Sequence, residues 1–192
     1  MLKTKFYILC KKFTKNTKLI DLLWKEIELE YSNNRYYHSL KHLCSIYQEL
    51  QTFKLSTIIE FTIFYHDIVY DINKSNNEEK SAILAKKNLL KIDVPNEIIN
   101  QVMQLIIESK SHHTIFNSHK KFLDADLHIL GSKSDIYQEY QKYSDNQYNY
   151  GRKLVLESIL KKDKIYNSDF FYQKYERKAR ENLLNEYKKL LS

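Results

Sequence analysis

Histidine and aspartate stand next to each other at His66 and Asp67, at the end of a nearly apolar segment that reads STIIEFTIFYHDIV over residues 56–69. Burying an unpaired carboxylate there would cost several kcal/mol, whereas a bound metal ion compensates the charge. The pair therefore predicts a metal site. The alternative is that Asp67 only ends a helix while His66 faces solvent.

Two further histidines lie upstream in the segment YHSLKH, residues 37–42. His38 and His42 are four residues apart, so on a helix they project from one face, one turn apart. Such a pair can bind one metal through both rings. It can also bind through one ring and leave the other to move protons. An exposed polar stripe is the alternative without chemistry.

Two aspartates interrupt the apolar segment FLDADLHILG, residues 122–131. Asp126 stands between Ala125 and Leu127 and so lies deeper in the apolar run. Asp124 is interpreted either as a carboxylate that accepts a hydrogen bond from a ligand imidazole or as an exposed helix position.

The elements that must position these residues are predicted to be helices. The chain has only 2 Gly and 1 Pro among 192 residues, too few for a turn-dense β-fold. Apolar periodicity and breakers favour an all-α fold, with residues 56–69 as a central buried helix that Ser56 caps. The expected helices cover residues 17–31, 37–53, 56–69, 77–91, 95–109, 118–129, 133–149, 151–162 and 169–190.

Size and composition limit the classes of protein further. A chain of 192 residues fits one domain. Cys10 and Cys44 form no disulfide framework, which favours a reducing compartment. No apolar run approaches the roughly 20 residues of a membrane span, so we expect a cytoplasmic protein without membrane contact. The net charge of +7 indicates solvated helix faces or a field that attracts anionic substrates, and nucleic acid is an unlikely partner.

Six motifs in order resemble the HD superfamily of metal-dependent phosphohydrolases, and more closely an uncharacterised bacterial branch of it. The resemblance covers residues about 20 to 190, with Tyr65 in place of Phe and Ser109 in place of Thr. The motifs are RYYHSLKH (35–42), YHDIVYD (65–71), NEEKSA (77–82), ESKSHH (108–113), DADLHILG (124–131) and ARENL (179–183).

The resemblance implies a single-domain HD-type helical bundle over residues 1–192, with a metal held between helices. It implies that His66, Asp67 and Asp126 bind the metal. The Y-H-x-x-x-H element is similar to that of cyclic-nucleotide phosphodiesterases, which implies that His42 is a ligand and His38 a general acid. In simpler HD proteins the first histidine is the ligand, so the reverse assignment stays open.

Further histidines are weaker candidates. Some HD proteins hold a second metal with extra histidines, and His112 falls where the resembling branch has one. His112 is therefore predicted to bind a metal or phosphate, and His113 is a lesser candidate. His119 and His128 match no motif and are expected to be surface or core residues.

Four other charged residues are candidates for roles around the metal. Glu78 could orient a water molecule or a ligand, or could simply be a carboxylate favoured at a helix N-terminus. Arg35, Lys110 and Arg180 are substrate-binding candidates as phosphate clamps, with exposed salt bridges as the alternative for each.

Two histidines and two aspartates form a mixed nitrogen and oxygen set, which suits Mn, Fe, Co, Ni, Mg or Zn rather than Ca. A divalent cation there would activate a water molecule. The expected function is hydrolysis of a phosphoester in a nucleotide or small phosphorylated metabolite. The alternatives are an HD-type di-iron oxygenase and a non-enzymatic basic binding module with a structural metal.

Overall fold

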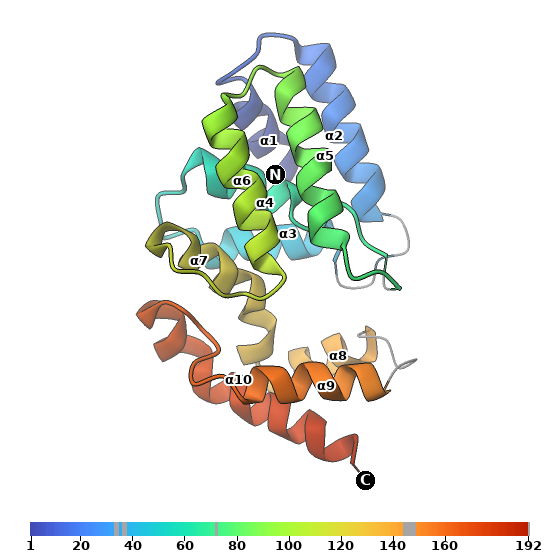
Figure 1. The fold of residues 1–192 in the computed structure, drawn as a ribbon, viewed down its shortest axis with the longest axis vertical. Coiled ribbons are helices and arrows are strands. Elements are labelled where there is room, and N and C mark those ends of the chain that lie inside the picture. Colours follow the sequence, from blue (N-terminus) through green and yellow to red (C-terminus); the bar gives the residue numbers. More distant parts are fainter. Residues whose placement is uncertain (33–34, 36–37, 72, 144–148, 192) are drawn as a thin grey trace. The chain divides into compact units, whose positions relative to one another are not determined.

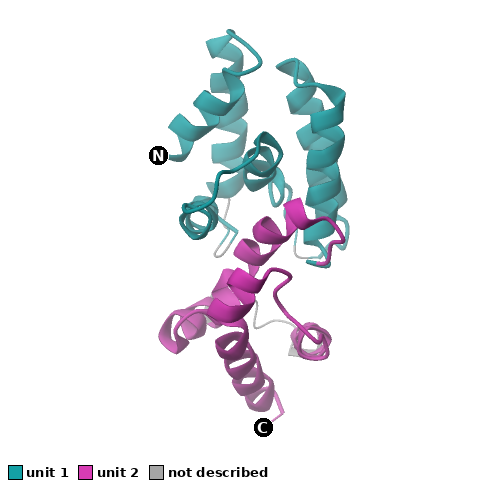
Figure 2. Cartoon of the chain, turned by 90° about the vertical axis from the view of Figure 1, so that its left-hand side faces the viewer, with its two compact units in different colours: residues 1–112 teal, residues 113–192 magenta. Residues whose placement is uncertain are grey.

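The structure is a computed structural model, and it describes residues 1–192 except 33–34, 36–37, 72, 144–148 and 192. The described part contains ten α-helices and one short 3-10 helix and has no strand, which confirms the prediction of an all-α fold (Figure 1). The chain divides into two compact units, residues 1–112 and 113–192 (Figure 2). Each unit is described below by itself.

The first unit is built around one apolar helix. Helix α4 contacts α1, α3, α5 and α6, which confirms the expectation of a central buried helix. The helices of this unit are α1 (Leu2–Cys10), α2 (Thr17–Ser32), α3 (Leu40–Glu49), α4 (Thr57–Tyr65), α5 (Asn77–Lys91) and α6 (Asn96–Ser109).

Helix α4 starts where the sequence predicts but ends earlier. The hydroxyl of Ser56 accepts a hydrogen bond from the Ile59 N–H at 3.3 Å, so the predicted N-cap is confirmed. Phe64 is fully buried and packs edge-on against Phe6 of α1, with ring centroids 5.0 Å apart. The helix ends at Tyr65 rather than at residue 69. His66 and Asp67 therefore lie just beyond its C-terminal end.

Two differences from the predicted elements concern the N-terminal third of the chain. Helix α1 was not predicted, although Leu2, Phe6 and Cys10 recur at helical spacing and are buried. The lysines interspersed among them hide this pattern in the sequence. Helix α3 begins at Leu40, with Ser39 as its N-cap residue, instead of at residue 37.

The second unit packs its helices around the long C-terminal helix α10. This helix contacts α7, α9 and the 3-10 helix η1. A Cβ atom at Gly131 would lie 2.5 Å from the Cβ of Tyr175, so only glycine allows η1 to pass this closely to α10. The helices of this unit are α7 (Asn117–Asp126), η1 (Leu127–Gly131), α8 (Ser134–Tyr143), α9 (Asn149–Leu160) and α10 (Asp169–Lys189).

The length and hydropathy of the helices show whether any of them could cross a membrane. Across the described residues, none of the helices is both long enough and apolar enough to cross a membrane.

Candidate metal centre

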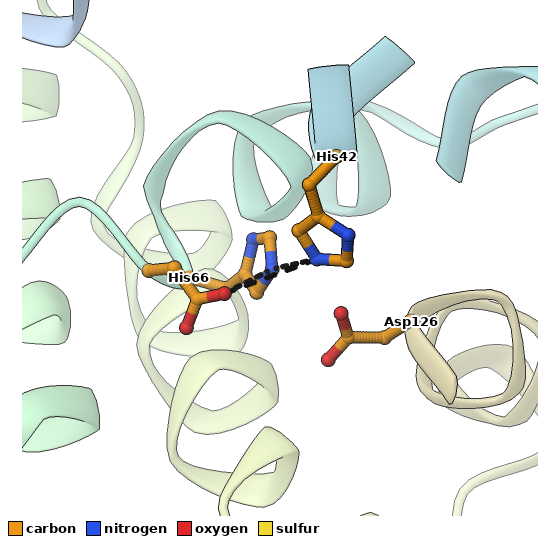
Figure 3. A group of neighbouring side chains, drawn as sticks. His42, His66 and Asp126 are labelled. Atoms are coloured by element: carbon orange, nitrogen blue, oxygen red, sulfur yellow. Dashed lines mark hydrogen bonds and ion pairs between the residues drawn. The ribbon is translucent and has the colours of Figure 1, made fainter. Parts of the chain in front are cut away.

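Three potential metal ligands come together in the first unit. Nε2 of His66 lies 3.0 Å from Oδ2 of Asp67 and 3.4 Å from Nε2 of His42. The remaining pair, Nε2 of His42 and Oδ2 of Asp67, is 3.9 Å apart. The two imidazole rings are neighbours (Figure 3), with centroids 5.4 Å apart and planes tilted by 51°. Each residue offers one ligand atom, and these atoms lie within 4.8 Å of one another, so the group could hold a metal ion.

Local structure determines which ring nitrogen of His66 faces the group. Nδ1 lies 3.1 Å from the carbonyl oxygen of Ile63, one turn back in α4. A carbonyl oxygen only accepts hydrogen bonds, so Nδ1 must carry the proton. In the neutral ring, Nε2 then presents a lone pair to Asp67 and His42. This orientation is the one that a metal ligand requires.

His42 reaches the group from the first turn of α3. Its neighbours Leu43 and Ile46 are buried in the core, which turns the helix so that His42 is itself only 3 % exposed. The hydroxyl of Ser45 donates a hydrogen bond to the carbonyl oxygen of His42 at 2.8 Å. A buried imidazole is a fixed ligand, since few rotamers are open to it.

The spacing of the three donor atoms fits one cation. Nε2 of His66 and Oδ2 of Asp67 are 3.0 Å apart. With Nε2 unprotonated, a cation between them would remove the repulsion of their lone pairs. Two ligands at about 2.1 Å from one metal lie about 3.0 Å apart at a right angle and about 4.2 Å apart when opposite. The three measured separations run from 3.0 to 3.9 Å. The donor set therefore fits a transition-metal ion in both distance and chemistry.

His38 lies at the same carboxylate but not on the same helix. Its Nε2 is 3.7 Å from Oδ2 of Asp67, and its side chain is 29 % exposed. The prediction that His38 and His42 share a helix face is wrong, because His38 precedes the Ser39 N-cap. The rings still approach each other edge-on, with centroids 5.8 Å apart. His38 is thus the accessible histidine of the group and His42 the buried one.

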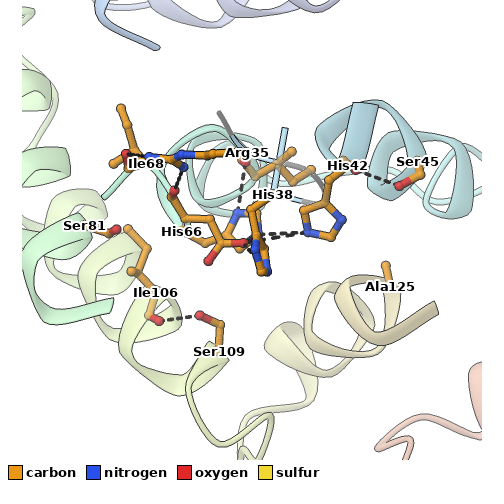
Figure 4. A network of polar contacts seen from close by, with 12 residues as sticks. Arg35, His38, His42, Ser45, His66, Ile68, Ser81, Ile106, Ser109 and Ala125 are labelled. Atoms are coloured by element: carbon orange, nitrogen blue, oxygen red, sulfur yellow. Dashed lines mark hydrogen bonds and ion pairs between the residues drawn. The ribbon is translucent and has the colours of Figure 1, made fainter. Parts of the chain in front are cut away.

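Arg35 holds the backbone beside this group. Its guanidinium donates hydrogen bonds to the carbonyl oxygens of Asp67, at 2.5 Å, and Ile68, at 2.8 Å (Figure 4). Its side chain is only 6 % exposed. Arg35 is a phosphate-clamp candidate in the sequence, with an exposed salt bridge as the alternative. The structure shows its guanidinium bound to the main chain next to the candidate ligands, and the clamp role stays a prediction.

Sequence analysis missed two residues that also hold this loop. Ser81 and Asn77 belong to the motif NEEKSA, in which only Glu78 was given a role. The hydroxyl of Ser81 accepts a hydrogen bond from the Val69 N–H at 3.0 Å. The side chain of Asn77 accepts one from the Asp71 N–H at 3.1 Å and donates one to the Asp71 carbonyl at 2.9 Å. The presence of both residues in one motif after the loop was the available signal.

Glu78 and Lys110 lie where α5 begins and α6 ends. Glu78 is in the first turn of α5, the position that the helix dipole favours for a carboxylate. The ammonium of Lys110 pairs with Glu79 at 2.7 Å and lies 3.7 Å from Glu78. Its hydrogen bond holds the pKa of Glu79 below the usual range, and the carboxylate in turn raises the pKa of Lys110. Lys110 thus forms the exposed salt bridge that was its alternative interpretation.

Arg180 is engaged within the second unit. Its guanidinium donates to Glu176 at 2.8 Å and to the carbonyl oxygens of Leu160, Lys162 and Asp163 at 3.2, 2.7 and 3.0 Å. It therefore satisfies the carbonyls at the C-terminal end of α9. With four of its donors committed, Arg180 could clamp a phosphate only by breaking these bonds.

The two aspartates of DADLHILG have different surroundings. Asp126 is the last residue of α7 and is partly exposed. Asp124 is fully buried and accepts hydrogen bonds of 2.6–2.9 Å from the backbone and side chains of Asn167 and Ser168. Both interpretations of Asp124, an exposed position and a partner of a ligand imidazole, are therefore wrong. It fixes the N-terminal end of α10.

The remaining histidines are more scattered. His112 follows α6 in a left-handed backbone conformation, with φ of 50°, and is not a member of the group formed by His42, His66 and Asp67. Its role as a ligand, and that of His113, stay predictions. His119 is buried on α7, and Nδ1 of His128 bonds to the carbonyl oxygen of Ala125 at 2.8 Å.

Comparison with protein-family models, with curated proteins and with solved structures yields no match for this chain. What supports a metal centre is therefore the arrangement of donor atoms in the first unit.

Proposed function

We propose that this chain is a metal-dependent phosphohydrolase of the HD type. His42, His66 and Asp67 would hold a divalent cation, with Mn, Fe, Co, Ni, Mg and Zn as the candidates. The substrate would be a nucleotide or a small phosphorylated metabolite.

One observation carries the proposal. Nε2 atoms of three histidines, His38, His42 and His66, lie within 3.0–3.9 Å of a single carboxylate oxygen, Oδ2 of Asp67. Two of these histidines are buried, so their rings are held in place. A hydrophobic core gains nothing from three imidazoles clustered around a carboxylate, whereas a metal site needs such a cluster of donor atoms.

We propose Asp126 as the fourth ligand. This part rests on the resemblance of DADLHILG to the distant carboxylate of HD proteins. Asp126 also differs from Asp124 in that its carboxylate is not buried in the cap of α10. These four residues would hold the ion and would leave part of its coordination shell to water and substrate.

The proposed reaction divides the work among these residues. A divalent cation lowers the pKa of a water molecule toward 7 and polarises a phosphoryl oxygen. His42 and His66 would hold the cation through Nε2, and Asp67 would supply negative charge. His38 is partly exposed and its Nε2 lies 3.7 Å from Oδ2 of Asp67, so that carboxylate could orient its ring. It would donate the proton at Nε2 to the leaving oxygen of the ester.

The test is a matrix of metals and substrates. The purified full-length chain is stripped of metal and resupplied in turn with each of the six candidate ions. It is then screened against nucleotides, cyclic nucleotides and phosphomonoesters for phosphate or nucleoside release. Activity that needs a metal and disappears in Asp67→Ala supports the proposal. Absence of hydrolysis with every metal, in protein that binds the metal, would contradict it.

An HD-type di-iron oxygenase is the second candidate. His42, His66 and the Asp67 carboxylate offer donor atoms that non-haem iron also accepts, and a second iron would need further histidines such as His112. Tight selection of iron together with oxygen consumption would favour this candidate. Phosphate release under anaerobic conditions would exclude it.

A further inference from the structure

We infer that Arg35 and Ser81 are positioning residues that hold the backbone after Asp67, so that its carboxylate faces the histidines. The inference rests on the proposed metal site, because the group that they position is its ligand set. Neither side chain is assigned a contact with metal or substrate.

The need for such residues follows from the end of α4. The last carbonyl groups of a helix have no partner within it, and the backbone that follows must find other partners. Helix α4 ends at Tyr65, and the ligand pair His66 and Asp67 comes directly after it. One turn bond continues from the helix, in which the Ile68 N–H donates to the Tyr65 carbonyl oxygen at 3.2 Å. The carbonyl oxygens of Asp67 and the residues after it must find other partners.

Side chains from two distant segments supply the missing partners. Arg35 occupies the carbonyl oxygens of Asp67 and Ile68 from one segment. Ser81 in α5 hydrogen-bonds both backbone groups of Val69. Its hydroxyl accepts from the Val69 N–H at 3.0 Å and donates to the Val69 carbonyl oxygen at 3.3 Å. Three consecutive residues are thus tied to side chains, beginning with the ligand itself.

The guanidinium of Arg35 is itself rigidly held. It lies 5.2 Å from the ring centroid of Tyr31 and 5.7 Å from that of Tyr70, and Glu30 is 3.6 Å away. Aromatic rings at such distances attract a cation through their π faces. Tyr70 also stacks against His38, with ring centroids 4.4 Å apart. Arg35 therefore contacts both the backbone of Asp67 and the ring of Tyr70, which in turn packs against His38, the proposed proton donor.

Lysine cannot replace this arginine. The planar fork of a guanidinium reaches two carbonyl oxygens at once, whereas an ammonium is a single point on a flexible stem. Arg35→Lys keeps the charge and loses the two-point contact. This variant therefore separates positioning from electrostatics.

The test compares metal affinity with stability in the full-length chain. The variants are Arg35→Lys, Arg35→Gln and Ser81→Ala. The control is Asn88→Ala, which also removes a buried side chain from α5, one that hydrogen-bonds Glu26 and Lys91 and not the backbone of residues 67–69. Each metal-free protein is titrated with Co²⁺, and the dissociation constant and visible absorption spectrum are recorded. Thermal unfolding without metal is measured in parallel.

We expect the three variants to bind Co²⁺ about 10–100-fold more weakly, the usual effect of losing a residue that orients a ligand. Their spectra should change shape, because Asp67 is displaced. Asn88→Ala should lower the unfolding temperature with no change in affinity or spectrum.

Two results would overturn the inference in distinguishable ways. If the wild-type chain binds no Co²⁺, the proposed metal site fails and the inference falls with it. If the wild type binds and the folded Arg35 and Ser81 variants bind equally well, with unchanged spectra, only the positioning role fails. Should Arg35→Gln not fold, Arg35→Lys and Ser81→Ala still decide between these results.

Discussion

At the residue scale, one carboxylate oxygen organises the candidate site. Oδ2 of Asp67 is 3.0 Å from Nε2 of His66, which is buried, and 3.7 Å from Nε2 of His38, which is partly exposed. Burial and exposure distinguish a fixed ligand from a group that can reach a substrate. We therefore expect the buried His66 and the partly exposed His38 to have different roles.

His42 and His38 should separate by mutation. His42→Ala should lower metal content, because its buried ring lies 3.4 Å from that of His66. His38→Ala should retain the metal and reduce turnover by roughly 10²–10⁴-fold. The loss should shrink for nitrophenyl phosphates, whose leaving group needs no proton. Metal analysis and turnover on both substrate types are the measurements.

The opposite pattern has a clear meaning. Loss of metal in His38→Ala together with retention in His42→Ala would invert the assignment. The first histidine would then be the ligand, as in simpler HD proteins.

Asp124 and Asp126 should also differ, but in kind rather than in degree. Asp124→Asn should destabilise the fold, because a buried carboxylate that accepts four hydrogen bonds is lost from the start of α10. The cost should be about 1–3 kcal/mol in the free energy of unfolding. Asp126→Asn should instead weaken metal binding with little effect on the metal-free protein. Chemical denaturation and metal titration of both variants separate the two roles, and equal loss of metal would count against them.

At the element scale, a partly buried ionic cluster joins three helices of the second unit. Glu186 of α10 receives hydrogen bonds from Arg152 of α9, at 2.7 and 2.9 Å, and from Tyr137 of α8, at 2.5 Å. Burial alone would raise the pKa of Glu186. The hydrogen bonds and charge of Arg152, with help from Tyr137, outweigh it and lower the pKa below 4.5.

The stability that this cluster confers should depend on pH. Because the pKa of Glu186 is lower in the folded chain, its contribution is complete above the ordinary value of 4.5 and is lost as the pH falls through the lowered value. Glu186→Gln should cost about 1.5–3 kcal/mol at neutral pH and should flatten the acid limb of stability. Urea unfolding from pH 7 to pH 3 measures this.

The matched control lies on the same helix. Glu181 pairs with Lys178 at 3.4 Å but is 48 % exposed, so Glu181→Gln should change stability by under about 1 kcal/mol. An equal effect of the two variants would show that Glu186 gains nothing from its burial.

At the scale of the whole molecule, metal binding should stabilise the folded chain. A cation that binds only the folded state adds about 2.7 kcal/mol when its concentration is 100 times the dissociation constant. Thermal unfolding should therefore shift upward by several degrees with Mn²⁺ or Co²⁺ and return on chelation. The same titration of Asp67→Ala should show no shift, and a full shift in that variant would place the cation elsewhere.

Much of the secondary structure can be predicted from the sequence. The helix over residues 77–91 is observed as Asn77–Lys91, and the cap at Ser56 is confirmed. These features are local, because apolar periodicity and capping depend on residues within a turn or two of one another. His42, His66 and Asp67 could likewise be proposed as ligands from their types and order.

What only the tertiary structure decided are the contacts between distant segments. His38 lies outside α3, yet its ring lies beside Asp67. Asp124 accepts hydrogen bonds at the start of α10 and not from an imidazole. Arg35 donates a hydrogen bond to a carbonyl oxygen 32 residues away. A polar side chain has several possible partners, and its sequence neighbours do not say which one the fold brings within 3 Å. Candidate ligands can therefore be proposed from residue type and spacing, while the residues that contact their backbone depend on packing between segments.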